Sequence, residues 1–384
     1  MKKSIYYWSP CLTKVGTVKS TLNSAISLAK YSKSYNVKIL NVFGEWSKYK
    51  DYLKKKNVEV EDLAFNYYNF LPKNGFLNSR FSYLTICFIS LIPLIIFLKR
   101  KKPDFLILHL ITSLPLILLN ILKFKSQIIL RISGYPKLNY LRRKLWIYSG
   151  NKISAITCPT KELKKKLIDK QIFQNEKVKI LFDAIINIEE LIDKKIDKNL
   201  IPKTNLDKGY FLSAGRFTKQ KNYIYLIKEF KKFLELHPNE KLVLIGEGEL
   251  EKKIKREITN CNLKKNIMLL NYTDNIYYYM KNSKAFILSS LWEEVGFVIV
   301  EAAVCNTFVI SSNCKNGPKE FLMDGKAGLL FENNENNGLF KKLKDFKKLK
   351  KNEIYEKKVL AKKNSVKFSM FRHFLSLKNI IEKN

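Results

Sequence analysis

Residues 285–303 have the sequence AFILSSLWEEVGFVIVEAA. The apolar run at residues 285–289 predicts a buried strand, and the apolar stretch that follows Gly296 predicts a helix. The loop between them carries Glu293, and Glu301 would lie about one and a half turns inside the helix, at 3.6 residues per turn. A strand followed at once by a helix is the repeating unit of a parallel sheet. The stretch therefore predicts an α/β fold with two carboxylates near the end of a strand.

The rest of the chain repeats this unit on both sides of the stretch. In the second half, apolar runs predict strands at residues 210–214, 241–245, 267–270 and 308–311, with helices at 222–236 and 250–258. In the first half, runs at residues 2–8, 36–42, 104–110 and 127–132 predict strands, and a helical pattern follows the Gly16-Thr17 turn. Strands that alternate with helices indicate parallel sheets covered on both faces.

Length and a break in composition predict two domains. The chain has 384 residues, and single cores stop growing beyond ~250–300 residues. The polar stretch at residues 185–208 lacks a sustained pattern, and we expect it to be the linker. We therefore expect a first domain at residues 1–200, a second at 201–360 and a C-terminal segment at 361–384. The apolar residues 368–381 of that segment predict a helix that packs against another part of the chain.

The composition excludes several classes of protein. With 46% hydrophobic and 13% aromatic residues, the chain is too apolar for a disordered protein, and its 14 Gly and 10 Pro exclude a collagen-like fibre. Its 71 Lys and Arg against 34 Asp and Glu give a net charge of +37. That charge favours anionic partners such as phospholipid headgroups, nucleic acid or phosphate-bearing substrates. Compositional drift from A/T-rich coding DNA is the alternative explanation, and both stay open.

Cysteine and histidine usage argues against a metal centre and against export. The six cysteines form no CxxC pair, and there are only three histidines, so we expect no metal site and reduced thiols in a cytosolic protein. The basic N-terminus lacks the apolar stretch of 7–15 residues that a signal peptide needs. We therefore expect no cleavage and no export.

Two segments have the composition of membrane-associated helices. Residues 81–98 carry no charge and are followed by four basic residues, a length that could just span a bilayer. Pro93 interrupts the segment, and predicted strands flank it, so a helix buried in the domain or lying in a membrane surface fits better. Residues 141–148 (LRRKLWIY) are amphipathic and basic, a pattern that suits an interfacial helix or an ordinary surface helix.

Two further segments place polar groups at strand ends. In residues 215–222 (GRFTKQKN), Arg216 and Lys221 lie where a strand ends and a helix begins, which suits a diphosphate, although a solvated basic loop fits as well. Residues 246–248 (GEG) form a tight turn that lacks the third glycine of a dinucleotide fingerprint, so a structural turn is the stronger interpretation. Glu293 and Glu301 suit hydrogen bonds from hydroxyls of a sugar and a ribose.

In this order, GRFTKQKN, GEG, SLWEEVGFVIVEAA and SSNCKNGPKEFLMDGKAGLLF resemble the retaining GT-B glycosyltransferases of family 4, the group 1 type. The resemblance covers residues 210–331 closely and the first half loosely, at Gly16-Thr17, Pro103-Asp104 and Pro159-Thr160. It implies two Rossmann-like domains that face each other across a cleft, the first binding the acceptor and the second the nucleotide sugar. It also implies a C-terminal helix that crosses back to the first domain.

The resemblance assigns roles to residues of this chain. Arg216 and Lys221 would hold the donor's diphosphate, Glu301 its ribose and Glu293 the hydroxyls of its sugar. The candidate catalytic residues are Arg216, Lys221 and Glu293, and the candidate donor-binding residues are Gly16, Arg216, Lys221, Gly246, Val295, Gly296, Phe297 and Glu301. Because the cations would stabilise the leaving diphosphate and no DxD sequence occurs, we expect no cofactor and no metal.

Two departures from the family pattern bear on these roles. Glu294 and Val295 intervene before Gly296, where many relatives have Glu followed directly by Gly-Phe, although the spacing of the carboxylates is kept. Many relatives also carry a histidine after the strand at residues 127–132, where this chain has Ile132-Ser133. His109 is an alternative functional histidine, or a buried structural one.

These observations predict a retaining transferase that moves a sugar from a nucleotide-diphosphate donor, a UDP-sugar, to a lipid-linked oligosaccharide, a lipopolysaccharide precursor or another cell-surface glycan. We expect it in the cytoplasm, peripheral on the inner face of the cell membrane, with no nucleic-acid partner because no nucleic-acid fold signature occurs. The alternatives are another GT-B enzyme, such as a nucleotide-sugar epimerase or phosphorylase, and a basic membrane- or nucleic-acid-binding protein without catalysis.

Overall fold

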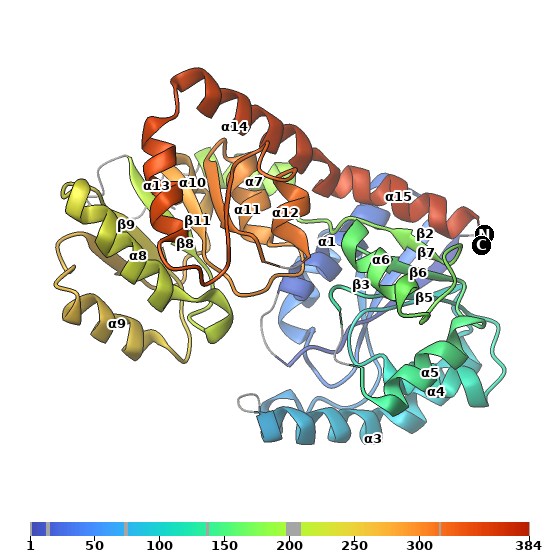
Figure 1. Cartoon of the computed structure of the whole chain (residues 1–384). Helices are drawn as coiled ribbons and strands as arrows, with labels where there is room; N and C mark the ends of the chain where they lie inside the picture. Colours follow the sequence, from blue (N-terminus) through green and yellow to red (C-terminus); the bar gives the residue numbers. More distant parts are fainter. Residues whose placement is uncertain are drawn as a thin grey trace. The chain divides into compact units, whose positions relative to one another are not determined.

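The computed structural model describes residues 2–12, 16–72, 76–135, 138–196, 209–314 and 316–383. Contacts divide the chain into two compact units, each built on one parallel sheet (Figure 1). Unit 1 comprises Met1–Ile185 and Phe368–Asn384, and unit 2 comprises Ile186–Lys367. The predicted α/β class with two parallel-sheet units is confirmed.

Unit 1 has a seven-stranded sheet with the order β3-β2-β1-β4-β5-β6-β7, all parallel. Its strands are β1 Lys3–Trp8, β2 Tyr35–Asn41, β3 Glu59–Asp62, β4 Phe105–Leu108, β5 Gln127–Arg131, β6 Ala155–Cys158 and β7 Val178–Ile180. Its helices are α1 Gly16–Tyr31, α2 Lys50–Lys54, α3 Phe76–Lys101, α4 Ser113–Ile121, α5 Tyr140–Gly150, α6 Lys161–Asp169 and α15 Met370–Glu382.

Helices cover both faces of this sheet, so its central strand β4 (FLIL) is a continuous apolar run rather than an alternating one. Side chains of β1 alternate between two cores. Tyr6 and Trp8 belong to the core under α3, α4, α5 and α6, whereas Ile5 and Tyr7 belong to the core under α1 and α15. The C-terminal helix α15 packs against α1, so the expected return of the chain's end to the first unit is confirmed (Figure 1).

Unit 2 has a six-stranded parallel sheet with the order β10-β9-β8-β11-β12-β13. Its strands are β8 Tyr210–Ala214, β9 Leu242–Ile245, β10 Ile267–Leu270, β11 Ser283–Leu288, β12 Phe308–Ser312 and β13 Leu329–Phe331. Its helices are α7 Ile188–Ile196, α8 Tyr223–Leu236, α9 Glu251–Asn260, α10 Ile276–Asn282, α11 Phe297–Val304, α12 Gly317–Phe321, α13 Gly338–Lys348 and α14 Lys351–Ser365. The core on one face is built from α8, α9 and α13.

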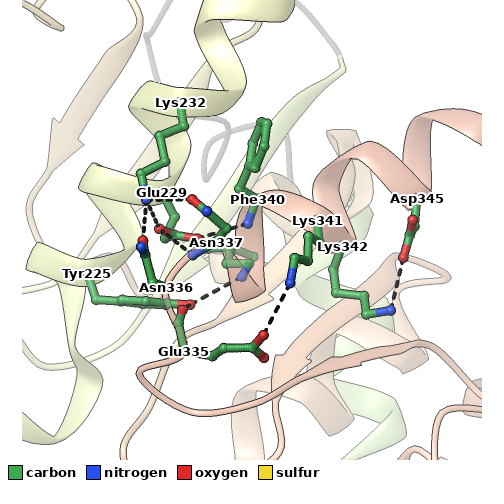
Figure 2. A network of polar contacts seen from close by, with 11 residues as sticks. Tyr225, Glu229, Lys232, Glu335, Asn336, Asn337, Phe340, Lys341, Lys342 and Asp345 are labelled. Carbon is green, nitrogen blue, oxygen red and sulfur yellow. Dashed lines mark hydrogen bonds and ion pairs between the residues drawn. The ribbon is translucent and has the colours of Figure 1, made fainter.

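A buried carboxylate joins two of these helices (Figure 2). Glu229 of α8 accepts hydrogen bonds from the backbone N–H groups of Asn337 and Phe340, at the start of α13. Lys232 donates to the same carboxylate at 2.7 Å and also to the side chain of Asn337. Glu229 therefore satisfies N–H groups that a helix start leaves without an internal partner, and it fixes α13 against α8.

The linker prediction was wrong for part of its length. Residues 188–196 form α7, which packs against α10 within unit 2. Ile188, Leu191 and Ile192 have the i, i+3, i+4 spacing of a helix, which charged residues between them obscure. Residues 197–208 lie outside the described part of the chain. The units divide at Ile185 and Ile186 and again at Lys367 and Phe368.

Candidate functional site

The three sequence segments with polar chemistry follow β8, β9 and β11. These strands are neighbours in the order β9-β8-β11, and all run parallel. Their carboxyl ends therefore meet at one edge of the sheet, where open α/β sheets bind ligands. The topology brings residues 215–222, 246–248 and 289–296 to the same edge of unit 2.

Glycines allow two of these loops to pack backbone against backbone. A Cβ atom added to Gly246 would lie 2.0 Å from the carbonyl oxygen of Gly215, and one added to Gly248 would lie 2.6 Å from that of Phe217. The N–H of Phe217 donates to the Glu247 carbonyl at 2.8 Å. The GEG turn therefore supports the loop that carries Arg216, and the role of Gly246 in donor binding stays a prediction.

Lys221 and Glu293 form an ion pair. The Nζ of Lys221 lies 2.5 Å from Oε1 of Glu293, and the two side chains are 13% and 8% exposed. Ser290 donates to the same carboxylate oxygen at 2.6 Å. The Lys221 stem runs beside Gly215, since its Cε would lie 3.1 Å from a Cβ at that position. Two of the candidate catalytic residues, 72 positions apart in the sequence, are thus in direct contact.

Backbone contacts fix the two loops on either side of this pair. The N–H of Leu291 donates to the Gln220 carbonyl, and the side chain of Gln220 donates to the Trp292 carbonyl, both at 2.8 Å. Ser289 donates its hydroxyl to the Lys221 carbonyl at 2.8 Å. These three hydrogen bonds hold the two loops together on either side of the ion pair.

A buried thiol and a buried phenol lie close to the ion pair. Burial, and then the Glu293 carboxylate, raise the pKa of Cys314 to about 12. Burial likewise raises the pKa of Tyr223, whose hydroxyl donates to the Gly215 carbonyl at 3.2 Å. Both groups are therefore held in the protonated form near neutral pH.

Gly296 begins the helix that carries Glu301. Its φ of 77° lies in the left-handed region, which a residue without Cβ adopts at little cost. Glu301 is buried in α11, and Val295 before the helix is buried as well. A Cβ on Gly317 would lie 2.3 Å from the Val295 carbonyl oxygen, so α12 approaches this backbone closely. The backbone at Val295 therefore packs against α12, and the first-turn N–H groups of α11 follow it directly.

Two other candidate residues, Arg216 and Gly16, are not part of the ion pair of Lys221 and Glu293. Arg216 is exposed and has no side-chain hydrogen bond or ion pair with any residue that the structure describes. Gly16 is the first residue of α1, in unit 1, and the loop at residues 13–15 lies outside the described part of the chain. Its predicted approach to the donor phosphates stays a prediction.

His109 is buried and lies at the carboxyl end of β4. Its Nδ1 lies 3.2 Å from the hydroxyl of Thr21, and its ring packs near that of Tyr7. Burial, and then the Arg131 charge, hold the pKa of His109 well below its usual range. The imidazole is therefore neutral near pH 7. That protonation state suits a base, but these contacts equally suit a structural residue.

Sequence reasoning missed a buried polar network in unit 1. Arg131 Nη2 lies 2.6 Å from Oδ1 of Asp183, and both side chains are at most 3% exposed. On α15, the buried His373 lies 2.7 Å from the Ser24 hydroxyl and contacts the Phe182 carbonyl, contacts that suit a packing residue. The sequence feature that could have indicated this network is the run of serine, threonine and asparagine in α1, because many of these polar residues lie on the buried face of the helix.

No group of three or more potential metal ligands occurs among the residues that the structure describes. All six cysteines are free thiols, and four of them are buried.

Comparisons with known proteins show that the part of the chain with this sheet edge is similar to a known family. The model of the family "Glycosyl transferases group 1" matches residues 193–364, which lie in unit 2. An uncharacterized glycosyltransferase of Methanocaldococcus jannaschii is 33% identical over 243 residues, 59% of either chain. The Campylobacter jejuni N-acetylgalactosamine-N,N'-diacetylbacillosaminyl-diphospho-undecaprenol 4-alpha-N-acetylgalactosaminyltransferase is 31% identical over 169 residues, 44% of either chain. The chain thus spans about half the length of these curated relatives.

Solved structures identify the fold. Anabaena HepE in complex with UDP and glucose superposes with a TM-score of 0.72 and 14% identity, and the match covers 100% of both chains. This likeness shows the fold alone, which is of the GT-B type with two Rossmann-like domains. The family match and the relatives' names support an enzyme that transfers sugars.

Proposed function

We propose that the chain is a retaining glycosyltransferase of family 4 that moves a sugar from a UDP-sugar to a lipid-linked or other cell-surface glycan. One observation carries the proposal: Lys221 and Glu293 meet at the carboxyl edge of a parallel sheet, beside the start of the helix that holds Glu301. The Campylobacter relative is named for a diphospho-undecaprenol acceptor, and HepE was solved with UDP. These names favour sugar transfer over epimerisation and over binding without catalysis.

Donor binding would replace the internal ion pair. In the ligand-free chain, Glu293 neutralises the ammonium group of Lys221. A diphosphate carries more negative charge than one carboxylate, so it would draw Nζ away and add Arg216 as a second cation. Glu293, released from the ammonium, would accept hydrogen bonds from hydroxyls of the sugar, and Glu301 from those of the ribose. The exchange couples the recognition of the diphosphate to that of the sugar.

The same groups would stabilise the transition state. Negative charge grows on the β-phosphate as the bond from the anomeric carbon to the phosphate oxygen breaks. Lys221, Arg216 and the first-turn amides of α11 would stabilise that charge, and such electrostatic stabilisation is usually the largest catalytic term. We propose that these two cations make a divalent metal unnecessary. The acceptor hydroxyl would attack from the face that the phosphate leaves and give its proton to that phosphate, which retains the anomeric configuration.

The transfer reaction tests the proposal directly. The full chain is incubated with UDP-glucose, UDP-galactose, UDP-N-acetylglucosamine or UDP-N-acetylgalactosamine and a detergent-solubilised undecaprenyl-diphosphate sugar, with EDTA present. We expect one donor to extend the acceptor by one sugar, seen by mass spectrometry, with an α-linkage in the proton NMR spectrum. A β-linked product would refute retention, a strict requirement for Mg²⁺ or Mn²⁺ would refute the metal-independent mechanism, and epimerised donor without transfer would refute the function.

A further inference from the structure

Helix α3 exposes a long apolar stripe although the opposite side of the helix is buried. Phe81, Leu84, Phe88, Ile92 and Ile96 are spaced by three or four residues and therefore share one side of the helix. All five are exposed, Phe88 to 83% and Leu84 to 65%. The stripe is about 22 Å long at 1.5 Å per residue. Isolated exposed apolar residues are ordinary, but a contiguous patch of this size marks an interaction surface.

Neighbouring helices extend this surface. Helices α3, α4 and α5 cover the same core of unit 1 and pack side by side, α4 against both of the others (Figure 1). On α4, Ile117 and Ile121 are exposed, and α5 exposes further apolar and aromatic side chains. Those of α5 are Tyr140, Leu141, Ile147 and Tyr148. We call the exposed side chains of α3, α4 and α5 the apolar-basic face.

The charged residues of this region are almost all basic. Residues 76–152 contain 13 Lys and Arg but a single acidic residue, Asp104. That carboxylate accepts hydrogen bonds from the backbone and hydroxyl of Ser4, so it is already engaged. Exposed cations lie at the ends of the three helices or on their outer sides. These are Lys99, Arg100, Lys102, Lys123, Lys125, Arg143 and Lys144. A surface with apolar side chains and cations complements the acyl chains and headgroups of an anionic bilayer.

The buried side of α3 decides between lying on the bilayer and crossing it. By length and composition alone, Arg80–Lys101 could span a membrane. However, Ile86, Leu94 and Phe97 are buried in the core of unit 1, and the Phe97 ring packs on Tyr6 of β1 with centroids 4.9 Å apart. A spanning α3 would have to leave this core.

From these observations we propose that the apolar-basic face docks unit 1 on an anionic phospholipid bilayer. Helix α3 lies in the membrane interface, with Phe88 among the upper acyl carbons and the cations at the level of the headgroups. The proposal deepens the proposed function, since a lipid-linked acceptor lies in such a bilayer, but membrane docking requires neither donor nor acceptor. It is therefore tested without either.

The test measures flotation of the full chain with vesicles of phosphatidylcholine, alone or with 30% phosphatidylglycerol. We expect binding to the anionic vesicles, weakened but kept at 0.5 M NaCl, because salt screens the charges and leaves the apolar contacts. Replacing Leu84, Phe88 and Ile92 together by serine should lower the partition coefficient about tenfold or more. The matched control replaces Met268 and Tyr355, exposed apolar residues of unit 2, by serine and should bind like wild type.

A second pair of variants isolates the charge. Lys99→Gln with Arg100→Gln should lower binding to the anionic vesicles about tenfold, with no effect on pure phosphatidylcholine. Lys252→Gln with Lys253→Gln removes the same charge from an exposed side of α9 in unit 2 and should have little effect. Equal losses for the two pairs would mean that net charge, not this face, attracts the lipid, and would overturn the proposal.

Two further measurements, the depth of residue 88 in the bilayer and the oligomeric state, distinguish interfacial docking from a spanning helix and from a dimer interface. In a Phe88→Trp variant, bromine near the headgroups should quench the indole more than bromine at the acyl ends. The reverse order would indicate a spanning helix and would refute interfacial docking. Sedimentation without lipid should give a monomer, whereas a wild-type dimer that the triple serine variant abolishes would assign the face to a second copy. Absence of vesicle binding would also overturn the proposal, and a circular dichroism spectrum like that of wild type ensures that each variant is folded.

Discussion

Replacing Lys221 by alanine should lower kcat/KM for sugar transfer by about 10²–10³-fold, the loss typical when one preorganised donor to a developing charge is removed. The Lys221 ammonium is held beside Gly215 and is paired with Glu293 in the ligand-free chain. The substitution removes a cation that would neutralise the leaving diphosphate. We expect most of the loss in kcat, because the charge on the phosphate grows in the transition state, with a smaller rise in KM.

The control for this prediction lies two residues away. Lys219 is in the same loop and is exposed, so Lys219→Ala removes the same charge outside the ion pair and should keep most of the activity. Because Lys221→Ala alone leaves the Glu293 carboxylate buried without its cation, the double variant Lys221→Met with Glu293→Gln restores neutrality. If the double variant regains stability but not transfer, the loss is chemical. Wild-type kinetics in Lys221→Ala would contradict the diphosphate assignment.

The largest effect on stability is expected at a different ion pair. Replacing Asp183 by alanine should lower the free energy of unfolding of unit 1 by about 3–5 kcal/mol, since it leaves a buried guanidinium without its counter-charge. Arg131 is 2% exposed and lies 2.6 Å from Asp183, which also accepts a hydrogen bond from Ser20 of α1. The substitution thus removes the partner of two groups at once. Urea unfolding followed by tryptophan fluorescence gives the change.

Two further variants show whether this loss comes from the uncompensated charge. Glu382→Ala breaks an exposed pair with Lys378 on α15 and should change the same free energy by less than about 1 kcal/mol. Arg131→Met with Asp183→Leu removes both charges and should recover much of the stability, because apolar pairs of similar volume often replace buried ion pairs without cost. A change below about 1 kcal/mol in Asp183→Ala would show that the pair is not needed.

Sequence patterns predicted the framework of both sheets because the central strands are apolar runs. The bounds of β8 and β10 matched the expected ones, and β1, β4 and β5 differed by a few residues at most. Strands β3, β6, β7 and β13 were not predicted. The sequence of the edge strand β3, EVED, is mostly charged, and at a sheet edge such residues are solvated. The helix expected at residues 81–98 is present as part of α3, which continues through Pro93.

The candidate site could be predicted only in part. The resemblance predicted Lys221 as a contact for the diphosphate and Glu293 as a contact for the sugar, without a contact between the two. Their mutual ion pair depends on how β8 and β11 lie side by side, which no local pattern encodes. The pair of Arg131 and Asp183 likewise joins the last residue of β5 to a loop residue that follows β7. Ser290 was not predicted as a site residue, although its hydroxyl donates a hydrogen bond to the Glu293 carboxylate.

Calorimetric titration with UDP, UMP and uridine tests most directly whether the cations of unit 2 hold a diphosphate. Wild type should bind UDP at least about tenfold more tightly than UMP and hardly bind uridine, because charge-assisted hydrogen bonds to the β-phosphate supply much of the affinity. In Lys221→Ala with Arg216→Ala, the preference for UDP over UMP should vanish while Lys219→Ala keeps it. Equal affinities of wild type for UDP and UMP, or an unchanged preference in the double variant, would contradict the account.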